Sequence, residues 1–287
     1  MKIIIRNCNV AELDIPLKYA TKLYNEFAIR HPNAFYLRTR QQGMQNWDGK
    51  IKYITKTGQF KIGLLPSVYK RCIELGIKPI IVDMRQSLPK VSKVVTQIGK
   101  YKLRPEQEKA VKAILSNKLG ETPFQIGVLD YTVNAGKTLI MSALYLSYKK
   151  QLKTLLITND SDWLNQARDE FKQYLPGEDI TFVQGKVLNW SNFTIGMVQS
   201  ISRNMKYYQN ELAKIDMVLI DEADQGGSKQ YQNVITRLFN TRVRIGLSGT
   251  IYMSKLAKDK VKNMNLRCFF GDVIAEFKLK DSIKKAQ

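Results

Sequence analysis

The chain has 287 residues, 44% of them hydrophobic, which is about the length of two ordinary domains with buried cores. Its 46 Lys and Arg against 25 Asp and Glu give a net charge of +21, and such an excess favours a polyanionic partner over a purely solubilising role. Three scattered cysteines without CxxC spacing and one histidine (His31) argue against a structural zinc site or a disulfide framework. The apolar runs are too short for a signal peptide or a membrane span.

The amino-terminal third is the more basic part of the chain. Residues 1–100 contain 18 Lys and Arg and 6 Asp and Glu, a net charge of +12. Apolar periodicity predicts strands over 2–5, 50–54 and 79–82 and helices over 16–28 and 67–75. We therefore predict a small basic α/β domain over residues 1–85, followed by a linker over 86–102 that contains Pro89 and Gly99.

Short apolar segments alternate with amphipathic ones from residue 103 onward. Strands are predicted near 127–129, 154–158, 194–198, 217–220 and 244–247, and helices near 106–115, 139–148 and 162–174. Strands that are apolar throughout and are separated by helices are typical of a parallel sheet covered on both faces. Residues 103–287 are thus predicted to form one α/β domain with a mainly parallel sheet.

A phosphate-binding loop is predicted directly after the first of these strands. The segment 131–138 ends in Ala-Gly-Lys-Thr and leads into an apolar helix, which is the context that such a loop requires. Lys137 would reach the β- and γ-phosphates of ATP, and Thr138 would bind Mg²⁺. Tyr131 replaces the usual first glycine, so a plain helix N-terminus is an alternative for this segment alone. The residues expected at the nucleotide here are Val133, Asn134, Ala135, Gly136, Lys137 and Thr138.

A pair of carboxylates follows another strand of the predicted sheet. Asp221 and Glu222 come directly after the apolar segment 215–220, and ligands of open α/β sheets bind at the carboxyl ends of strands. Asp221 can hold Mg²⁺, and Glu222 can orient and deprotonate the attacking water. A solvated acidic turn is the alternative, but it leaves unexplained why both motifs end strands of one sheet. We interpret Lys137, Asp221 and Glu222 as the catalytic residues of an ATP hydrolase.

Together these motifs resemble those of superfamily 2 helicases and translocases. Six segments follow that superfamily's order: residues 103–107, motif I (131–138), motif Ia (155–166), motif Ib (196–200), motif II (221–224) and motif III (247–250). The resemblance implies a RecA-like P-loop domain that uses ATP and Mg²⁺ and moves on DNA. The letters Asp-Glu-Ala-Asp of motif II do not make the chain a DEAD-box RNA helicase, because the upstream signature of that branch is absent.

The resemblance also assigns roles outside the phosphate loop. Gln107, with Arg104 nearby, is expected to read the adenine, and Ser248, Gly249 and Thr250 are expected to couple the nucleotide site to the DNA site. The residues of motifs Ia and Ib expected at the nucleic acid are Asn159, Gln166, Gln199 and Ser200.

Motif Ia departs from the family pattern at two positions. Asp160 is an acid where the motif usually has threonine, so it either points away from the phosphates or marks a changed DNA path. Trp163 stands where leucine is common. It could stack on a base, but a core position is the favoured interpretation.

Basic and aromatic residues are interleaved in the amino-terminal region. Arg38, Arg40, Lys50, Lys52, Lys56 and Lys61 alternate with Tyr36, Trp47, Tyr53 and Phe60. Cations suit phosphates and rings suit exposed bases, whereas the alternative is a solvated basic face over a core that holds the rings. We predict nucleic-acid contacts at Arg38, Arg40, Trp47, Lys50 and Lys52. Trp47 could be a wedge at a fork or an anchor for the turn at residues 48–49, and the anchor is favoured.

The function predicted from these features is an ATP-dependent DNA helicase or branched-DNA translocase, present here as its nucleotide-binding half. By resemblance to phage members, it would act in recombination, repair or replication in the host cytoplasm. Only 37 residues follow Thr250, too few for a second RecA-like domain with an arginine finger, so a continuation or partner is expected to supply one and this chain alone to turn over poorly. The alternatives are a nucleic-acid-binding module without turnover and the motor subunit of a restriction or nuclease system.

Overall fold

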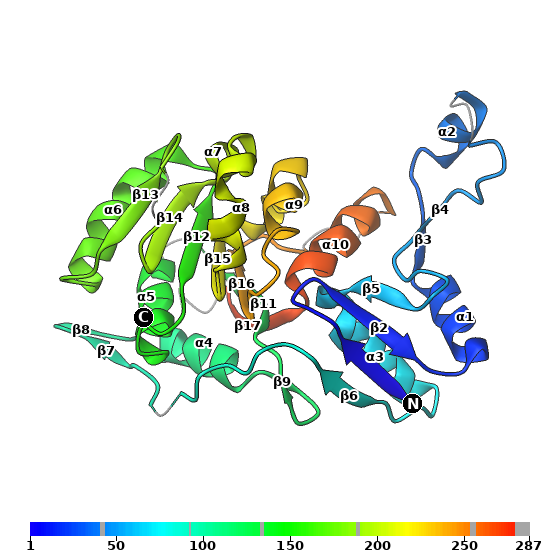
Figure 1. Ribbon diagram of the computed structural model, residues 1–287, viewed down its shortest axis with the longest axis horizontal. Coiled ribbons are helices and arrows are strands. Elements are labelled where there is room, and N and C mark those ends of the chain that lie inside the picture. Colours follow the sequence, from blue (N-terminus) through cyan, green and yellow to red (C-terminus); the bar gives the residue numbers. More distant parts are fainter. Residues whose placement is uncertain (41–43, 92, 133–134, 188–189, 253–256, 279–287) are drawn as a thin grey trace. The chain divides into compact units, whose positions relative to one another are not determined.

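The computed structural model describes residues 1–40, 44–91, 93–132, 135–187, 190–252 and 257–278. The chain divides into two compact units (Figure 1). Unit 1 comprises Met1–Met84 and Tyr252–Gly271, and unit 2 comprises Arg85–Ile251 and Asp272–Gln287. The chain therefore passes between the units three times.

Unit 1 is built on a four-stranded sheet with the strand order β5-β2-β1-β6. Its central strand β1 pairs antiparallel with β2 and parallel with β6. Alternate residues of β1 and β2 are buried, including Ile3, Ile5, Ala11 and Leu13, as expected for a sheet with one covered face. The elements of this part are β1 (Lys2–Ile5), β2 (Val10–Asp14), α1 (Leu17–Glu26), β5 (Gln59–Lys61), η1 (Ile62–Leu64), α3 (Leu65–Glu74) and β6 (Ile80–Asp83).

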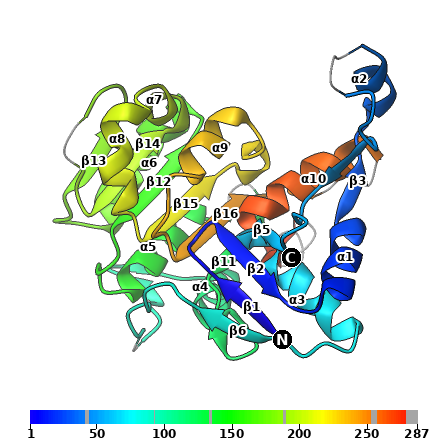
Figure 2. The same cartoon turned by 45° about the vertical axis from the view of Figure 1, so that its right-hand side comes forward.

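A short arm, defined here as residues 28–52, leaves this sheet (Figures 1 and 2). It consists of β3 (Ala28–Arg30), α2 (Ala34–Arg40) and β4 (Lys50–Lys52). The two strands pair antiparallel, with Ile29 opposite Ile51. Helix α2 lies at the end of this hairpin that is farther from the four-stranded sheet (Figure 1).

Helix α10 (Ala257–Phe270) belongs to unit 1. The prediction that residues 103–287 form one domain therefore differs from the structure at this helix. The helix packs against η1 at Gly63, where any side-chain carbon would clash with the backbone oxygen of Arg267. The hydroxyl of Tyr53 donates to Oδ1 of Asn265 at 3.0 Å. These contacts join residues about 200 positions apart, so local patterning could not reveal them.

Unit 2 is built on a seven-stranded sheet with the order β13-β14-β12-β15-β16-β11-β17. Every pair of neighbouring strands in it is parallel. All residues of the central strands β11, β12, β15 and β16 are buried. The strands are β11 (Ile126–Tyr131), β12 (Thr154–Thr158), β13 (Ile180–Val183), β14 (Phe193–Met197), β15 (Met217–Asp221), β16 (Val243–Ser248) and β17 (Val273–Phe277). The predicted parallel sheet and its five predicted strands are confirmed.

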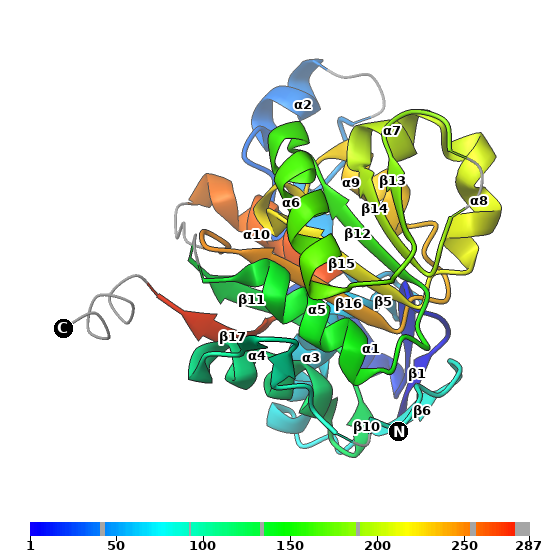
Figure 3. The same ribbon diagram turned by 90° about the vertical axis from the view of Figure 1, so that its left-hand side faces the viewer.

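Helices cover both faces of this sheet, as Figures 1 and 3 show. One face carries α4 (Pro105–Ser116), α5 (Lys137–Ser147) and α6 (Ser161–Tyr174), which are the three predicted helices. The other carries α7 (Val198–Arg203), α8 (Met205–Ala213) and α9 (Lys229–Ile235). The predicted linker holds a hairpin of β7 (Gln97–Ile98) and β8 (Tyr101–Lys102), and β9 (Lys118–Leu119) pairs with β10 (Thr122–Pro123). No described helix is long and apolar enough to cross a membrane.

Candidate nucleotide site

The phosphate loop lies between the carboxyl end of β11 and the start of α5. Gly136 has a φ of +74°, a left-handed conformation that glycine adopts without strain. A side-chain carbon there would also meet the side-chain amide nitrogen of Gln107, so the Gln107 side chain would have to move to admit one. Two predicted nucleotide contacts, Val133 and Asn134, lie outside the described residues.

Gln107 braces the phosphate loop from α4. Its Nε2 donates to the carbonyl oxygen of Ala135 at 2.9 Å, and its Oε1 accepts from the backbone N–H of Arg104 at 2.9 Å. The side chain is buried, with the whole residue 3% exposed. The structure thus brings Arg104, Gln107 and Ala135 together, as the sequence predicts, with both ends of the Gln107 amide bonded to backbone.

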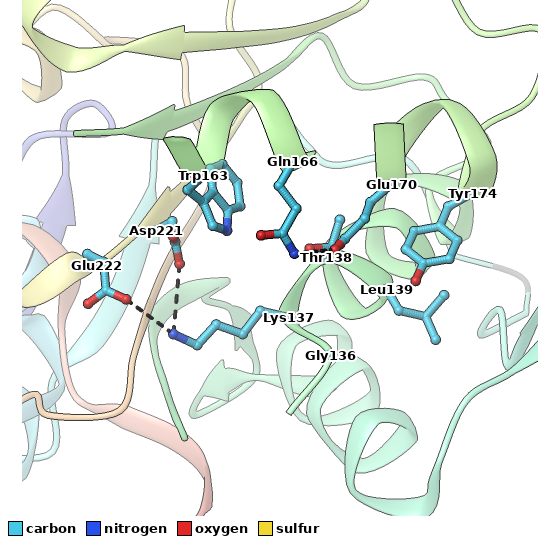
Figure 4. Close-up of a pocket in the computed structure, with 10 residues that line it drawn as sticks. All are labelled: Gly136, Lys137, Thr138, Leu139, Trp163, Gln166, Glu170, Tyr174, Asp221 and Glu222. Carbon is cyan, nitrogen blue, oxygen red and sulfur yellow. Dashed lines mark hydrogen bonds and ion pairs between the residues drawn. The ribbon is translucent and has the colours of Figure 1, made fainter. Parts of the chain in front are cut away.

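The carboxylate pair lies at the carboxyl end of β15, and β16 separates this strand from β11. The Nζ of Lys137 is 3.8 Å from Oδ1 of Asp221 and 3.6 Å from Oε1 of Glu222 (Figure 4). Glu222 has a φ of +50°, uncommon for a residue with a side chain, and such strain is often found at functional sites. Parallel strands have therefore placed residues 84 positions apart within ion-pair distance, as predicted.

Burial dominates the electrostatics of Asp221. The residue is 3% exposed, and loss of water raises its pKa to about 6, with Glu222 and Asp160 also raising it and Lys137 opposing the rise. A divalent cation would offset the cost of burying the ionised Asp221 carboxylate. Thr138 is buried one residue after Lys137. Its hydroxyl and the Asp221 carboxylate are hard oxygen donors, which fits the ligand preference of Mg²⁺.

A pocket of about 340 Å³ opens between the start of α5 and one face of α6. Figure 4 shows Trp163 next to Asp221, and Gln166 beside Thr138 and Glu170. Its lining residues are Gly136, Lys137, Thr138, Leu139, Trp163, Gln166, Glu170, Tyr174, Asp221 and Glu222. Sequence reasoning missed Glu170 and Tyr174. The spacing of positions 163, 166, 170 and 174 is that of one helical face and could have revealed them.

The four predicted nucleic-acid residues of unit 2 do not form one cluster. Nε2 of Gln199 donates to the carbonyl oxygen of Asn159 at 3.3 Å, and Ser200 follows Gln199 on α7. Gln166 instead lines the pocket, where its Nε2 donates to Oε1 of Glu170 at 2.8 Å. The structure places Gln166 beside the phosphate loop rather than with Asn159 and Gln199.

Asp160 caps helix α6. Its Oδ1 accepts from the backbone N–H groups of Asp162 and Trp163 at 2.8 and 3.1 Å. These amides would otherwise lack partners at the helix start. The acid in this unusual position thus has a local structural role. Trp163, two residues into the helix, is half-buried and packs against the core of unit 2 while its edge lines the pocket.

Motif III is joined to motif II by hydrogen bonds. Oγ of Ser248, at the end of β16, donates to Oδ1 of Asp224 at 3.0 Å, and it accepts from the backbone N–H of Thr250 at 3.2 Å. Gly249 lies between them, where a side-chain carbon would approach the backbone of Tyr131 and Thr132. The three residues predicted to couple sites therefore contact both the carboxylate loop and the start of the phosphate loop.

Tyr231 was not found by sequence reasoning. It lies on α9, is 1% exposed, and its hydroxyl has no hydrogen-bond partner within the part of the chain that the structure describes. Burial and the nearby carboxylates Asp221, Asp224 and Glu222 raise its pKa. The sequence pattern could not reveal this buried hydroxyl, because the carboxylates near it come from other elements.

The predicted nucleic-acid residues of unit 1 are all on the arm. Arg38 and Arg40 are exposed on α2, and Lys50 and Lys52 lie on β4. Trp47 is half-buried; its Nε1 donates to the carbonyl oxygen of Lys50 at 3.0 Å, and its ring meets His31 edge-on at 5.9 Å between centroids. Trp47 is therefore an anchor of the arm, the favoured of the two predicted alternatives.

An all-parallel sheet that brings a loop lysine and a carboxylate pair together is the arrangement of a RecA-like P-loop domain. The chain belongs to the family described as "Type III restriction enzyme, res subunit", whose model matches residues 100–253. That match covers more than half of the chain.

Two curated proteins are similar in sequence. The ATP-dependent DNA helicase uvsW of Enterobacteria phage T4 is 24% identical in an alignment 249 positions long that covers 79% of this chain and 47% of that protein. A putative ATP-dependent RNA helicase, L396 of Acanthamoeba polyphaga mimivirus, is 26% identical over 147 residues, which are 51% of this chain and 27% of that protein. The chain thus spans about a quarter to a half of the length of these relatives.

The solved structures agree on the fold. A crystal structure of the UvsW helicase from bacteriophage T4 superposes with a TM-score of 0.72 at 20% identity, over 97% of this chain and 100% of that one. A nuclease-deletion mutant of the type ISP restriction-modification enzyme LlaGI, in complex with a DNA substrate mimic, gives a TM-score of 0.50 at 15% identity, over 64% of this chain and 18% of that one.

Proposed function

We propose that this chain is the nucleotide-binding half of an ATP-driven DNA helicase or branched-DNA translocase that acts in recombination, repair or replication. The observation that carries the proposal is the position of the Lys137 ammonium, within 4 Å of both Asp221 and Glu222 at the mouth of a pocket. Similarity to a phage DNA helicase over 79% of the chain supports DNA as the track.

In this function each residue at the pocket has a distinct task. Lys137 and the amides at the start of α5 bind the β- and γ-phosphates, and Gly136 lets the backbone approach them. Thr138 and Asp221 would hold Mg²⁺, which supplies positive charge at those phosphates. Glu222, whose side chain is 42% exposed, orients the attacking water and takes its proton. The hydrogen bond from Ser248 to Asp224 couples motif III to motif II.

The test is ATP hydrolysis by this chain with and without forked DNA. Glu222→Gln should retain ATP binding but lower turnover by about 100-fold or more, because a positioned general base typically contributes 10²–10⁴. Lys137→Ala should lose ATP binding itself. A Glu222→Gln variant that hydrolyses ATP at the normal rate would refute the assignment of the base.

The rate of ATP hydrolysis by the unsubstituted chain tests whether the chain is active by itself. Turnover that forked DNA stimulates, and that Lys137→Ala lacks, would show that the chain works as a motor. ATP and DNA binding without turnover would show that catalysis needs a second RecA-like domain, in line with the fraction of each relative that the chain spans. Loss of ATP binding in the unsubstituted chain would leave only a nucleic-acid-binding module.

The family description favours one further candidate, the motor subunit of a restriction system. Both candidates use the same nucleotide chemistry and differ in their DNA. A restriction motor should be stimulated by long linear duplexes, whereas a branched-DNA motor should prefer short forked substrates over blunt duplexes of equal length. Comparing the two stimulations at equal nucleotide concentration separates the candidates.

A further inference from the structure

The tip of the arm presents two aromatic rings to solvent. Phe35 is 79% exposed and Tyr36 is 55% exposed, and both lie on α2. Ala34, the buried residue of this helix, packs close to Gly49. The helix therefore buries its smallest apolar side chain and exposes its largest ones, the reverse of an ordinary amphipathic helix. Two adjacent exposed rings are available for contact with a partner.

Two arginines follow these rings on the same helix. The guanidinium of Arg40 lies over the Tyr36 ring at 5.1 Å, and Arg38 is exposed one turn away from the helix start. Among the described residues, neither arginine forms an ion pair with a carboxylate. Residues 28–52 contain five Lys and Arg and one acid, Asp48, whose carboxylate pairs with Lys52 at 3.1 Å. The positive charges of Arg38 and Arg40 are therefore available to bind an anionic partner.

Trp47, the ring that the sequence singled out, does not have this role. Its indole nitrogen donates to Lys50 and its ring contacts His31, both within the arm. The ring therefore stabilises the hairpin. The two exposed rings of the arm are Phe35 and Tyr36, 12 and 11 positions before Trp47.

We propose that Phe35 and Tyr36 stack on unpaired bases of a nucleic-acid strand while Arg38 and Arg40 bind the adjacent phosphates. This proposal rests on the proposed function and names the substrate feature that unit 1 reads. Stacking on rings beside a cationic path is the general mode of single-strand binding. Duplex DNA offers phosphates but no free base faces along its length, so the chemistry of the tip fits a fork or a single-stranded end.

The variant that tests the proposal is the full chain with Phe35→Ala and Tyr36→Ala. Its affinity for a labelled single strand and for a forked duplex should fall by about 10-fold or more, since each stacked base typically contributes 1–3 kcal/mol. Its affinity for a blunt duplex should stay within about twofold of the unsubstituted chain. Leu17→Ala, which removes an apolar side chain 76% exposed on α1, is the matched control and should change none of the three.

An abasic strand and a salt titration separate rings from cations. An abasic strand should bind the unsubstituted chain as weakly as a normal strand binds the ring variant, and the ring variant should not distinguish the two strands. Arg38→Ala with Arg40→Ala should reduce the slope of log K against log salt by about 1 to 2, because about 0.7 of a counterion is released per single-strand phosphate contacted. The ring variant should keep the slope.

The outcomes also distinguish this proposal from the proposed function. Normal strand and fork binding by a folded ring variant, with Lys137→Ala still lacking ATP binding, would overturn the tip proposal and leave the motor intact. Equal losses on strand, fork and blunt duplex would also overturn it, because the tip would then read charge alone. Failure of Lys137→Ala to affect ATP binding would instead overturn the proposed function, whatever the arm does.

Discussion

Asp221 shows how much of the site depends on single buried charges. The Lys137 ammonium opposes the rise in its pKa, while burial and the neighbouring acids drive the pKa to about 6 from an ordinary 3.8. Without a cation on the phosphate side, the ionised carboxylate destabilises the fold. We expect the cost of this buried carboxylate to be measurable as a loss of stability in the free protein.

Asp221→Asn should stabilise the free chain. In buffer with EDTA, the folded state binds the Asp221 proton more readily than the unfolded state, so stability falls as pH rises from about 4 to 6 and the loss is complete above about 6. The substitution should raise the free energy of unfolding at pH 7.5 by about 1–3 kcal/mol and by less at pH 5. Urea unfolding at both pH values measures this, with Asp14→Asn, the same change at an exposed carboxylate of unit 1, as the control. An equal gain at both pH values would contradict it.

Tyr231→Phe should leave the fold unharmed or slightly more stable. The hydroxyl is buried without a partner among the described residues, so removing it deletes an unsatisfied polar group and leaves the ring packing in place. The expected change in the free energy of unfolding is between 0 and about +1 kcal/mol. Urea unfolding at pH 7.5 is the measurement. Destabilisation by more than about 1 kcal/mol would mean that the hydroxyl donates a bond in the folded chain.

At the scale of elements, helix α6 is capped by Asp160 and forms one wall of the pocket. The helix presents Trp163, Gln166, Glu170 and Tyr174 to the pocket from one face. Its first turn is fixed by the two hydrogen bonds that the Asp160 carboxylate accepts. The cap therefore positions Trp163 next to the carboxylates.

Asp160→Ala should destabilise α6 and loosen this wall. Loss of a capping carboxylate typically costs about 1 kcal/mol, and Asp160→Asn should retain most of the cap because asparagine is an equally good capping residue. Hydrogen exchange of the amides of residues 162 and 163 should accelerate in the alanine variant and stay near normal in the asparagine variant. Equal exchange in both variants would show that the side chain does not hold the helix start.

The elements with clear periodicity were predictable, and the site followed from them. Fully apolar strands and the motifs at their ends located Lys137, Asp221 and Glu222, because parallel strands collect their carboxyl ends on one edge. Short elements such as α2 and β3 carry too few residues for a periodic signal. Side chains that meet only through tertiary packing, such as Tyr231 and the carboxylates, leave no local pattern.

At the scale of the whole molecule, the charge of +21 is spread over both units and supports a polyanionic track. The contrast in charge predicts a domain change near residue 100, whereas the structure divides the chain after Met84, after Ile251 and after Gly271. The sequence could not locate α10, whose partner is a glycine in a short turn of the amino-terminal unit. The helix can approach there because Gly63 has no side chain. A single glycine of this kind leaves no trace in the composition or periodicity of the sequence.

The position of α10 has a consequence for anyone who wishes to study the ATPase part by itself. A truncation that removes residues 1–84 would also remove η1, on which α10 packs, and would leave buried Cys268 without its neighbour Gly63. Such a fragment invites aggregation. A cleaner dissection deletes both segments and bridges Ile251 to Asp272 with a short flexible linker, so that β17 can still pair with β11.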